Sequence, residues 1–317
     1  FKVKPMSEKS NFFKKNGYVN FGNSILSFDD TIELASLCKK FYTKIKKMNP
    51  STFKSNTHEF NKLIVHDIET ASFINQILSN KDIKYFLDEI LGQNFKIWDI
   101  GIRRSIPGDR GLYLHQDGPG QINMAILLDD NLGKDGSTAV LSGSHLVEKS
   151  QKKLRLEIPP FLLNFFPYLF SSLSGEVGDV CFFSNRVWHG RYSNNSKLNH
   201  DVLIIGFFPS GYSYYDETWP DNLIELNSIP ELGKLLASSE DYKNSITKSS
   251  CESRELDAFH IDQSHGYSMQ IENDNYLLNQ QRSLRLVMTI LFLKCAFIIL
   301  KILYAPLKLS KNLLKTF

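Results

Sequence analysis

The sequence lacks the marks of several common protein classes. It has four cysteines and no CxxC spacing, which argues against a disulfide framework and against a zinc site. Its first residues contain no apolar stretch, so no signal peptide is expected. No window of about 18 residues is both apolar and free of charge, so an ordinary membrane-spanning helix is not expected. Reduced thiols are typical of the cytosol, and we predict a cytoplasmic protein.

The order of the predicted elements indicates the fold. A short strand at 18–21 and helical patterns within 27–50 and 59–92 come first. Short apolar strands follow at 95–105, 112–115, 122–128, 138–141, 179–184 and 201–208. We predict an α+β protein with a mainly β core: a double-stranded β-helix, or cupin-like jelly-roll barrel, with flanking helices and a C-terminal amphipathic helix.

Two short segments, 74 positions apart, contain the side chains that suit a metal ion. Residues i and i+2 of a strand share a face, so His115 and Asp117 can bind one ion together. A later strand of the same barrel can bring His189 to that ion. Two imidazoles and one carboxylate leave open positions and suit non-haem Fe(II). Taken alone, a His-x-Asp is more often a histidine that lies by chance near an acid.

Further segments surround these residues in a definite order. In chain order these segments are Phe13-Lys14-Lys15-Asn16-Gly17-Tyr18-Val19, His115-Gln116-Asp117, Gly136 to His145, Gly175-Glu176-Val177-Gly178-Asp179, Trp188-His189-Gly190 and Ser193-Asn194-Asn195-Ser196. In this order the chain resembles the phytanoyl-CoA dioxygenase family of Fe(II)/2-oxoglutarate oxygenases, over roughly residues 10–210.

The resemblance implies the cofactors and the reaction. His115, Asp117 and His189 would be the iron ligands and the catalytic centre, with Fe(II), 2-oxoglutarate and O2 bound beside an organic substrate. A carboxylate at position 117, where a small residue would open a halide site, points to hydroxylation. Where the family usually has Pro-Gly-Ser-His, this chain has Ser142-Gly143-Ser144-His145. We expect His145 to have a structural role rather than to be a fourth ligand.

One departure from the family concerns the co-substrate. Family members commonly hold the distal carboxylate of 2-oxoglutarate with an arginine eleven residues after the distal histidine, and this chain has His200 there. An arginine is always charged and donates two parallel hydrogen bonds, whereas a neutral histidine donates one. Either His200 binds the co-substrate as an imidazolium, or another basic residue does. The other candidates for cofactor binding are Arg191, Arg103, Arg104 and Lys197, with Gln121 at the start of the next strand; each basic residue could instead be a solvated surface charge.

The insert between the two metal-binding segments is basic at first and then aromatic. Residues 150–173 include a run from Pro159 to Phe170 that is rich in phenylalanine and leucine. Such an insert is expected to cover an apolar substrate, because loops at a barrel mouth often set specificity. The alternative is a helix packed on the outside of the barrel.

The C-terminal tail differs in charge from the rest of the chain. Residues 282–317 contain seven lysines and arginines and no acid. Lys294, Lys301 and Lys308 are spaced by seven residues, so a helix would place them on one stripe beside a wide apolar face. This pattern predicts a helix lying on an anionic membrane surface, and the alternative is a helix in a core or dimer interface. Nucleic acid is not an expected partner, since the tail lacks polar residues that read bases.

These observations predict three regions: an oxygenase-like barrel domain at 1–236, a polar linker at 237–281, and a basic amphipathic tail at 282–317. The predicted function is Fe(II)/2-oxoglutarate-dependent hydroxylation of an organic substrate, with a lipid or lipid-linked compound favoured by the tail and the insert. Two other readings remain open. One is a non-catalytic jelly-roll that binds a metal or a small ligand and is tethered to a membrane, and the other is a membrane-associated scaffold.

Overall fold

The computed structural model describes most of the predicted barrel and short pieces of the tail. The described residues are 7–23, 25–48, 57–60, 63–66, 68–116, 121–146, 160–209, 219–224, 228–238, 288–289, 291–293, 295–296 and 298–299. Asp117, nearly all of the predicted linker and most of the tail lie outside these residues. The three predicted regions, and the continuous amphipathic tail helix, therefore stay predictions.

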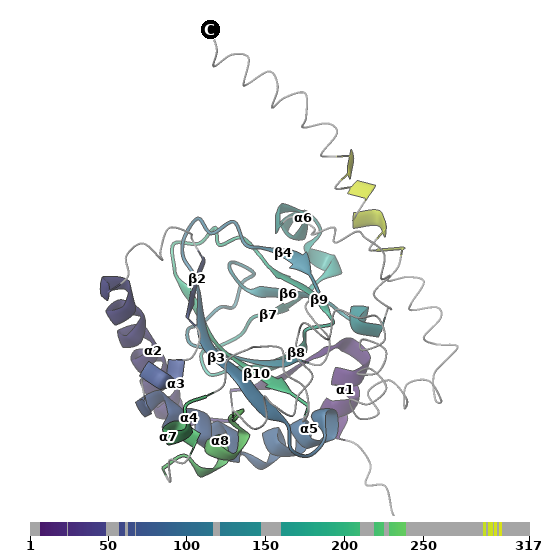
Figure 1. Cartoon of the computed structure of the whole chain (residues 1–317). Helices are drawn as coiled ribbons and strands as arrows, with labels where there is room; N and C mark the ends of the chain where they lie inside the picture. The colour runs from purple at the N-terminus through teal and green to yellow at the C-terminus, as the bar shows by residue number, and fades with distance from the viewer. Residues whose placement is uncertain are drawn as a thin grey trace, which may run out of the picture.

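Two antiparallel sheets face each other within the described residues (Figure 1). The six-stranded sheet has the order β1 (Tyr18–Gly22), β8 (Val180–Ser184), β5 (Ile122–Leu127), β10 (His200–Phe208), β3 (Lys96–Ser105) and β2 (Thr57–Phe60). The four-stranded sheet has the order β4 (Leu112–His115), β9 (Trp188–Arg191), β6 (Thr138–Leu141) and β7 (Ser171–Leu173). From β3 to β6 and again from β7 to β10, consecutive strands alternate between the two sheets, which is the jelly-roll arrangement. The predicted fold class is confirmed.

Helices cover the outer face of the six-stranded sheet (Figure 1). They are α1 (Glu8–Asn16), α2 (Phe28–Met48), α3 (Leu63–His66), α4 (Ile68–Ser79), α5 (Lys81–Leu91), α7 (Asp221–Ile224) and α8 (Pro230–Leu235). The helical pattern expected within 59–92 comprises α3, α4 and α5, but its first two residues belong to β2 instead. Asn80 divides α4 from α5, because its side chain accepts hydrogen bonds from the backbone of Asp82 and Ile83 and so caps a new helix.

The core between helices and sheet is built around phenylalanine rings. Phe182 of β8 is fully buried, and its ring lies 5.3 Å from that of Phe21 and 4.7 Å from that of Phe86 on α5. Such aromatic pairs add to the free energy that comes from burial alone. The cluster therefore joins β1, β8 and α5 into one unit.

Alternation along β3 separates two neighbouring arginines. Arg104 faces the helix layer, where its guanidinium makes two hydrogen bonds with Asp201 of β10, the one from Nε measuring 2.5 Å, and lies 3.6 Å from the centroid of the Tyr42 ring on α2. Burial works against the charge, but the bonds and the charge of Asp201 still raise the pKa of Arg104. Arg103 pairs with Val202 of β10 and so lies on the opposite face, toward the space between the sheets. Arg104 is therefore not a candidate for cofactor binding.

The four-stranded sheet has a much thinner cover. Helix α6 (Pro160–Phe165) and the 3₁₀ turn η3 (Pro167–Leu169) lie on its outer face, where Leu162 and Leu163 pack with Leu114 and Leu141. The expectation that the insert covers the substrate is wrong for its described residues, because these leucines face outward-pointing residues of β4 and β6. No described helix is long and apolar enough to cross a membrane.

Candidate functional site

Two histidines meet on the inner face of the four-stranded sheet. His115 ends β4, and His189 lies directly opposite it on the neighbouring antiparallel strand β9. Their ring centroids are 4.5 Å apart and the ring planes are inclined by 50°. His189 is buried and also lies beside the Phe183 ring, at 5.3 Å between centroids. The structure thus brings together two side chains that are 74 positions apart in the sequence.

Backbone carbonyls orient both rings in the same way. His115 Nδ1 lies 2.6 Å from the Tyr113 carbonyl oxygen, and His189 Nδ1 lies 2.9 Å from the Val187 carbonyl oxygen. A carbonyl only accepts, so each Nδ1 carries the proton and each Nε2 carries the lone pair. This is the usual arrangement for metal-binding histidines, in which an outer partner fixes the tautomer.

His145 has the opposite orientation. Its Nε2 lies 2.9 Å from the carbonyl oxygen of Lys14, so Nε2 is the protonated nitrogen. The ring is buried against Gly17, where an added Cβ would lie 2.6 Å from Nδ1. Burial lowers the pKa of His145 to about 4, with the nearby charge of Arg186 acting in the same direction. These contacts tie the loop after β6 to helix α1, which agrees with the structural role expected for this residue.

The imidazole pair fits a metal ion. Both rings keep Nε2 as the nitrogen with a lone pair, the form in which imidazole binds a metal, and their centroids are 4.5 Å apart. The described residues contain no group of three His, Cys, Asp or Glu side chains that could hold a metal. The third expected ligand, Asp117, lies outside them, so the complete triad stays a prediction.

Arg191 lies on the same face as the histidines. It follows His189 by two positions on β9 and pairs with Leu112 and Thr138 across the sheet. Its side chain is largely buried, with one ion pair of 3.0 Å between Nη2 and Asp109 Oδ2. Asp109 also accepts a hydrogen bond of 2.7 Å from Ser105. A buried guanidinium therefore lies one strand repeat from His189.

His200 is held by neighbours of its own. Its Nδ1 donates to Asp129 Oδ1 at 3.2 Å, and Ser196 Oγ lies 3.3 Å from its Nε2. Asp129 also accepts from the backbone N–H of Asp201 at 2.7 Å. The imidazole is buried, and an added Cβ on Gly136 would lie 3.2 Å from it. His200 therefore packs tightly at the start of β10 with a carboxylate partner already in place.

Two further basic candidates are less suited to the co-substrate. Arg103 is on the inner face, but Nη2 lies 3.4 Å from Asp99 Oδ2 four residues earlier on the same strand, and Nη1 donates to the carbonyl of Ile102. Lys197 is exposed in the loop before β10. Neither residue lies on a strand that carries a histidine of the pair.

Gln121 belongs to a closed ring of three amides. Its Nε2 donates to Asn123 Oδ1 at 2.7 Å, Asn123 donates to Asn185, and Asn185 Nδ2 donates back to Gln121 Oε1 at 2.5 Å. All three residues are buried, and Gly206 leaves room for the ring, because a Cβ there would lie 2.6 Å from Gln121 Nε2. Sequence reasoning missed Asn123 and Asn185. The signal for Asn123 was its place two residues after Gln121 in an otherwise apolar strand.

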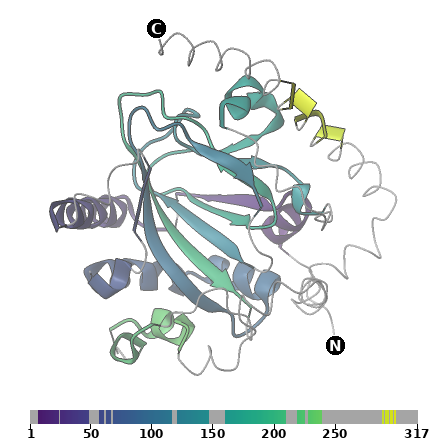
Figure 2. The ribbon, with the colours of Figure 1, turned by 45° about the horizontal axis from the view of Figure 1, so that its top comes forward.

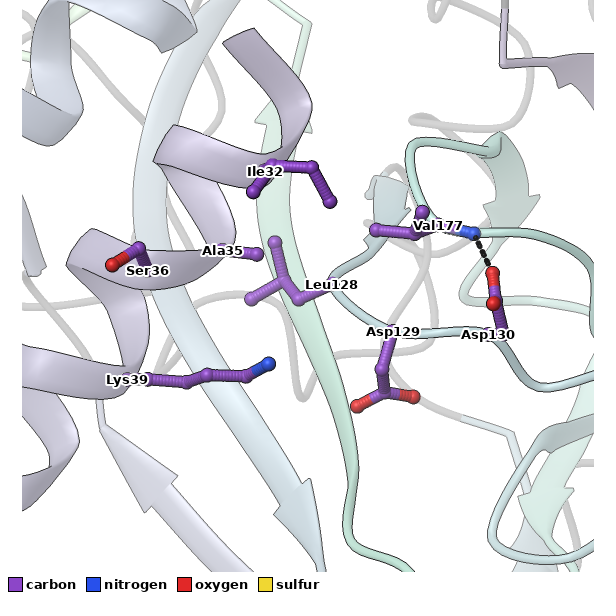
Figure 3. Close-up of a pocket in the computed structure, with 8 residues that line it drawn as sticks. All are labelled: Ile32, Ala35, Ser36, Lys39, Leu128, Asp129, Asp130 and Val177. Carbon is purple, nitrogen blue, oxygen red and sulfur yellow. Dashed lines mark hydrogen bonds between the residues drawn. The ribbon is translucent and has the colours of Figure 1, made fainter. Parts of the chain in front are cut away.

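A surface pocket of about 380 Å³ lies elsewhere, between α2 and the segment that follows β5 (Figure 3). Its lining includes Ile32 and Lys39 on one side and Leu128, Asp130 and Val177 on the other. The Val177 N–H donates to Asp130 across this side at 2.9 Å. Neither histidine of the pair lines it, so this pocket is not the candidate site.

Comparison with known proteins agrees with the fold. The sequence model of the phytanoyl-CoA dioxygenase (PhyH) family matches residues 14–198, which is more than half of the chain. No curated protein matches.

Solved structures of other proteins share this fold. The non-haem α-ketoglutarate-dependent carbocyclase SnoK from nogalamycin biosynthesis is 16% identical, covers 66% of this chain and 85% of its own, and has a TM-score of 0.51. EctD from S. alaskensis is also 16% identical, covering 66% of this chain and 79% of its own with a TM-score of 0.51. HygX from Streptomyces hygroscopicus, solved with nickel and 2-oxoglutarate bound, is 14% identical over 69% of this chain and 94% of its own, with a TM-score of 0.50. With its family match and its jelly-roll fold, the chain belongs to the phytanoyl-CoA dioxygenase family and is an Fe(II)- and 2-oxoglutarate-dependent oxygenase.

Proposed function

We propose that the chain is a hydroxylase in which His115, Asp117 and His189 hold Fe(II) and Arg191 holds the distal carboxylate of 2-oxoglutarate. The bound iron and co-substrate supply the oxidation: O2 is consumed, 2-oxoglutarate gives succinate and CO2, and one oxygen atom enters a C–H bond of the substrate. The observation that carries the proposal is the pair of like-oriented imidazoles at 4.5 Å with a buried arginine two residues away.

The support for Arg191 is its position. Residues i and i+2 of a strand are roughly 6.6 Å apart, which is comparable to the length of a five-carbon dicarboxylate chelated at the metal. A guanidinium carries a permanent charge and five N–H donors in a fork that matches a carboxylate, which suits Arg191 to the distal carboxylate of 2-oxoglutarate. In a site shielded from water such a contact is stronger than at the surface.

His200 has a different part in this proposal. Its imidazole bonds Asp129 and packs against Gly136, so it shapes the end of the co-substrate site rather than making the charged contact. Arg191 on β9, in the other sheet, takes the role of the arginine that the family usually has at position 200. Asp99 holds Arg103 in the same way that Asp129 holds His200.

The remaining inner-face residues keep the site dry. Val140, Val187 and Phe183 form a cluster between the sheets, with Val202 and Ile204 packed against it. This apolar wall adjoins His189 and would limit the access of water to the site, which suppresses side reactions. The amide ring of Gln121, Asn123 and Asn185 is the polar exception, and it fixes the turn between β8 and β9 that leads to His189.

We propose a lipid or lipid-linked compound as the substrate, with the protein at a membrane surface. The support is the basic, acid-free tail at 282–317 and the bulky apolar side chains that α6 and the tail expose. The alternative from another class, a tethered jelly-roll that binds a ligand without turnover, differs in one observable: it would bind iron without converting 2-oxoglutarate.

The test is an anaerobic titration of the Fe(II)-loaded protein with 2-oxoglutarate, recording the visible charge-transfer band of the chelate. We expect a band in the wild type and an affinity for 2-oxoglutarate reduced roughly 10- to 100-fold in Arg191→Met, because a charge-assisted contact is lost. His200→Gln should bind 2-oxoglutarate within a few-fold of the wild type.

Arg110→Met, which removes an exposed arginine on the segment before β4, is the matched control and should change nothing. A band weakened by His200→Gln and unchanged by Arg191→Met would move the anchor to His200. Iron binding without any band in the wild type would refute the 2-oxoglutarate mechanism and favour the non-catalytic alternative.

A further inference from the structure

Bulky apolar side chains gather on the outer side of the four-stranded sheet. In α6 and η3, Phe165 is 74% exposed and Tyr168 is 76% exposed. The described tail residues Met288, Leu291, Phe292, Ile298 and Ile299 are each about half exposed. Figures 1 and 2 both place these tail pieces, drawn in yellow, beside α6. Contiguous apolar surface of this kind marks a site of interaction.

The described tail residues divide into two faces at helical spacing. Thr289, Leu293 and Ala296 are less exposed, and Leu293 is fully buried. These three follow the i, i+4, i+7 spacing of one helix face. The exposed set, which is Met288, Leu291, Phe292, Cys295, Ile298 and Ile299, follows the spacing of another face and contains no charged side chain. One apolar face packs against the protein, and a second apolar face is exposed. An exposed apolar face of this kind is typical of a surface that binds a partner.

Direct contacts join the tail to the insert. Leu293 belongs to the apolar cluster of Leu162 and Leu163 on α6. The Phe292 ring lies 5.4 Å from the Phe166 ring in an edge-to-face arrangement of 76°. Segments more than a hundred residues apart therefore form one surface, which we call the apolar platform: Phe165, Phe166 and Tyr168 with the exposed tail residues.

We infer that the apolar platform docks on an anionic lipid surface, with α6 and the tail inserting side by side. Two features favour lipid over a protein partner. The tail carries seven basic residues and no acid, and each basic residue near an anionic bilayer adds to binding. Phenylalanine, tyrosine and aliphatic side chains on a helix with basic flanks are typical of helices that lie in the membrane interface.

The position of the platform relates it to the site. Helix α6 contacts β4 and β9, the two strands whose inner faces carry His115 and His189. A docked membrane would therefore lie on the far side of the same thin sheet. The inference rests on the proposed function for the lipid nature of the substrate, and it adds which surface meets the bilayer.

The first experiment is co-sedimentation of the full Fe(II)-loaded chain with vesicles. We expect at least roughly tenfold tighter binding to phosphatidylcholine vesicles containing phosphatidylserine than to phosphatidylcholine alone, with weaker binding at higher salt. The double substitution Phe165→Glu/Tyr168→Glu, with the tail intact, should weaken binding by roughly tenfold or more. Leu291→Glu/Ile299→Glu should do the same.

Phe28→Glu is the matched control, since Phe28 is 71% exposed at the start of α2 on the other side of the molecule. It should bind vesicles as the wild type does. Normal binding by Phe165→Glu/Tyr168→Glu would overturn the composite platform and leave the tail acting alone. Wild-type protein that ignores both vesicle types would overturn the proposal, and dimers that these substitutions dissociate would show that a second copy covers the platform instead.

A second measurement does not depend on a loss of binding. In Tyr168→Trp, anionic vesicles should shift the added tryptophan emission to the blue, whereas Phe28→Trp should show no shift. An unshifted Tyr168→Trp in protein that does sediment would contradict insertion of α6. The 2-oxoglutarate chelate band, recorded for each variant, separates the two ideas: a band with no vesicle binding refutes the platform alone, and vesicle binding with no band refutes the oxygenase mechanism alone.

Discussion

The two sheets of the barrel differ in what they carry and in how they are covered. The six-stranded sheet is backed by long helices and a fully buried aromatic core. The four-stranded sheet has short strands and an outer cover of α6, η3 and parts of the tail, yet it carries both histidines of the pair and Arg191. In the proposed mechanism, the helix-backed six-stranded sheet supplies stability, while the thinly covered four-stranded sheet supplies the chemistry and the proposed contact with lipid.

The largest expected effect is on the thin sheet. His189→Gln should lower 2-oxoglutarate turnover at least roughly a hundredfold, because a metal ligand is lost, and should change the melting temperature little. Turnover is measured as succinate formed with added Fe(II). His145→Gln is the matched control and should retain activity within a few-fold, since its ring bonds Lys14 instead. Equal losses in both variants would argue against His189 as a ligand.

The next effect compares buried and exposed phenylalanines across the two sheets. Phe182→Ala should cost about 3–5 kcal/mol of unfolding free energy, because it empties a fully packed site. Phe165→Ala on α6, where the ring is mostly exposed, should change stability by less than about 0.5 kcal/mol. Urea unfolding followed by circular dichroism measures both. A large cost for Phe165→Ala would mean that the outer cover of the thin sheet is a structural core.

The smallest expected effect is a pH dependence of stability that comes from His145, which joins α1 to the loop after β6. The pKa of His145 is lowered to about 4 by burial, whereas an unfolded histidine titrates near 6.5. Between these values the unfolded chain binds a proton that the folded chain does not, so stability falls as pH drops below about 6.5. The loss should reach roughly 3 kcal/mol by pH 4 from this residue.

Urea unfolding at pH 7.5 and pH 5 gives the slope. His145→Gln, whose amide can still donate to the Lys14 carbonyl, should flatten the pH dependence. An unchanged slope in this variant would assign the acid sensitivity to other groups.

Some of this architecture follows from local pattern. The strands at 122–128 and 201–208 are mostly apolar because both sheet faces are buried there. His115 and His189 were indicated by their residue type and by their place in the ordered segments that resemble the family. The family match and the sheet topology confirm the family and the jelly-roll class, and the two histidines lie opposite each other on neighbouring strands. Asp117 lies outside the described residues, so the carboxylate of the triad still rests on the sequence.

Other features were beyond the sequence. Alternation along β3 showed that Arg103 and Arg104 face opposite ways, but only the packing of Tyr42 and Asp201 decided which one faces the helices. The insert could have covered the site or the outside, and Leu162 and Leu163 on the outer face decided it.

By itself, the sequence determined most of the element types, the jelly-roll class and the two histidines as candidates, because periodicity and residue chemistry are local properties. The tertiary structure decided which basic residue lies beside the pair, which amides close a ring, and that α6 and the tail share one surface. Those facts depend on contacts between residues far apart in the chain, and a pattern along one strand says which residues share a face but not what lies across from them.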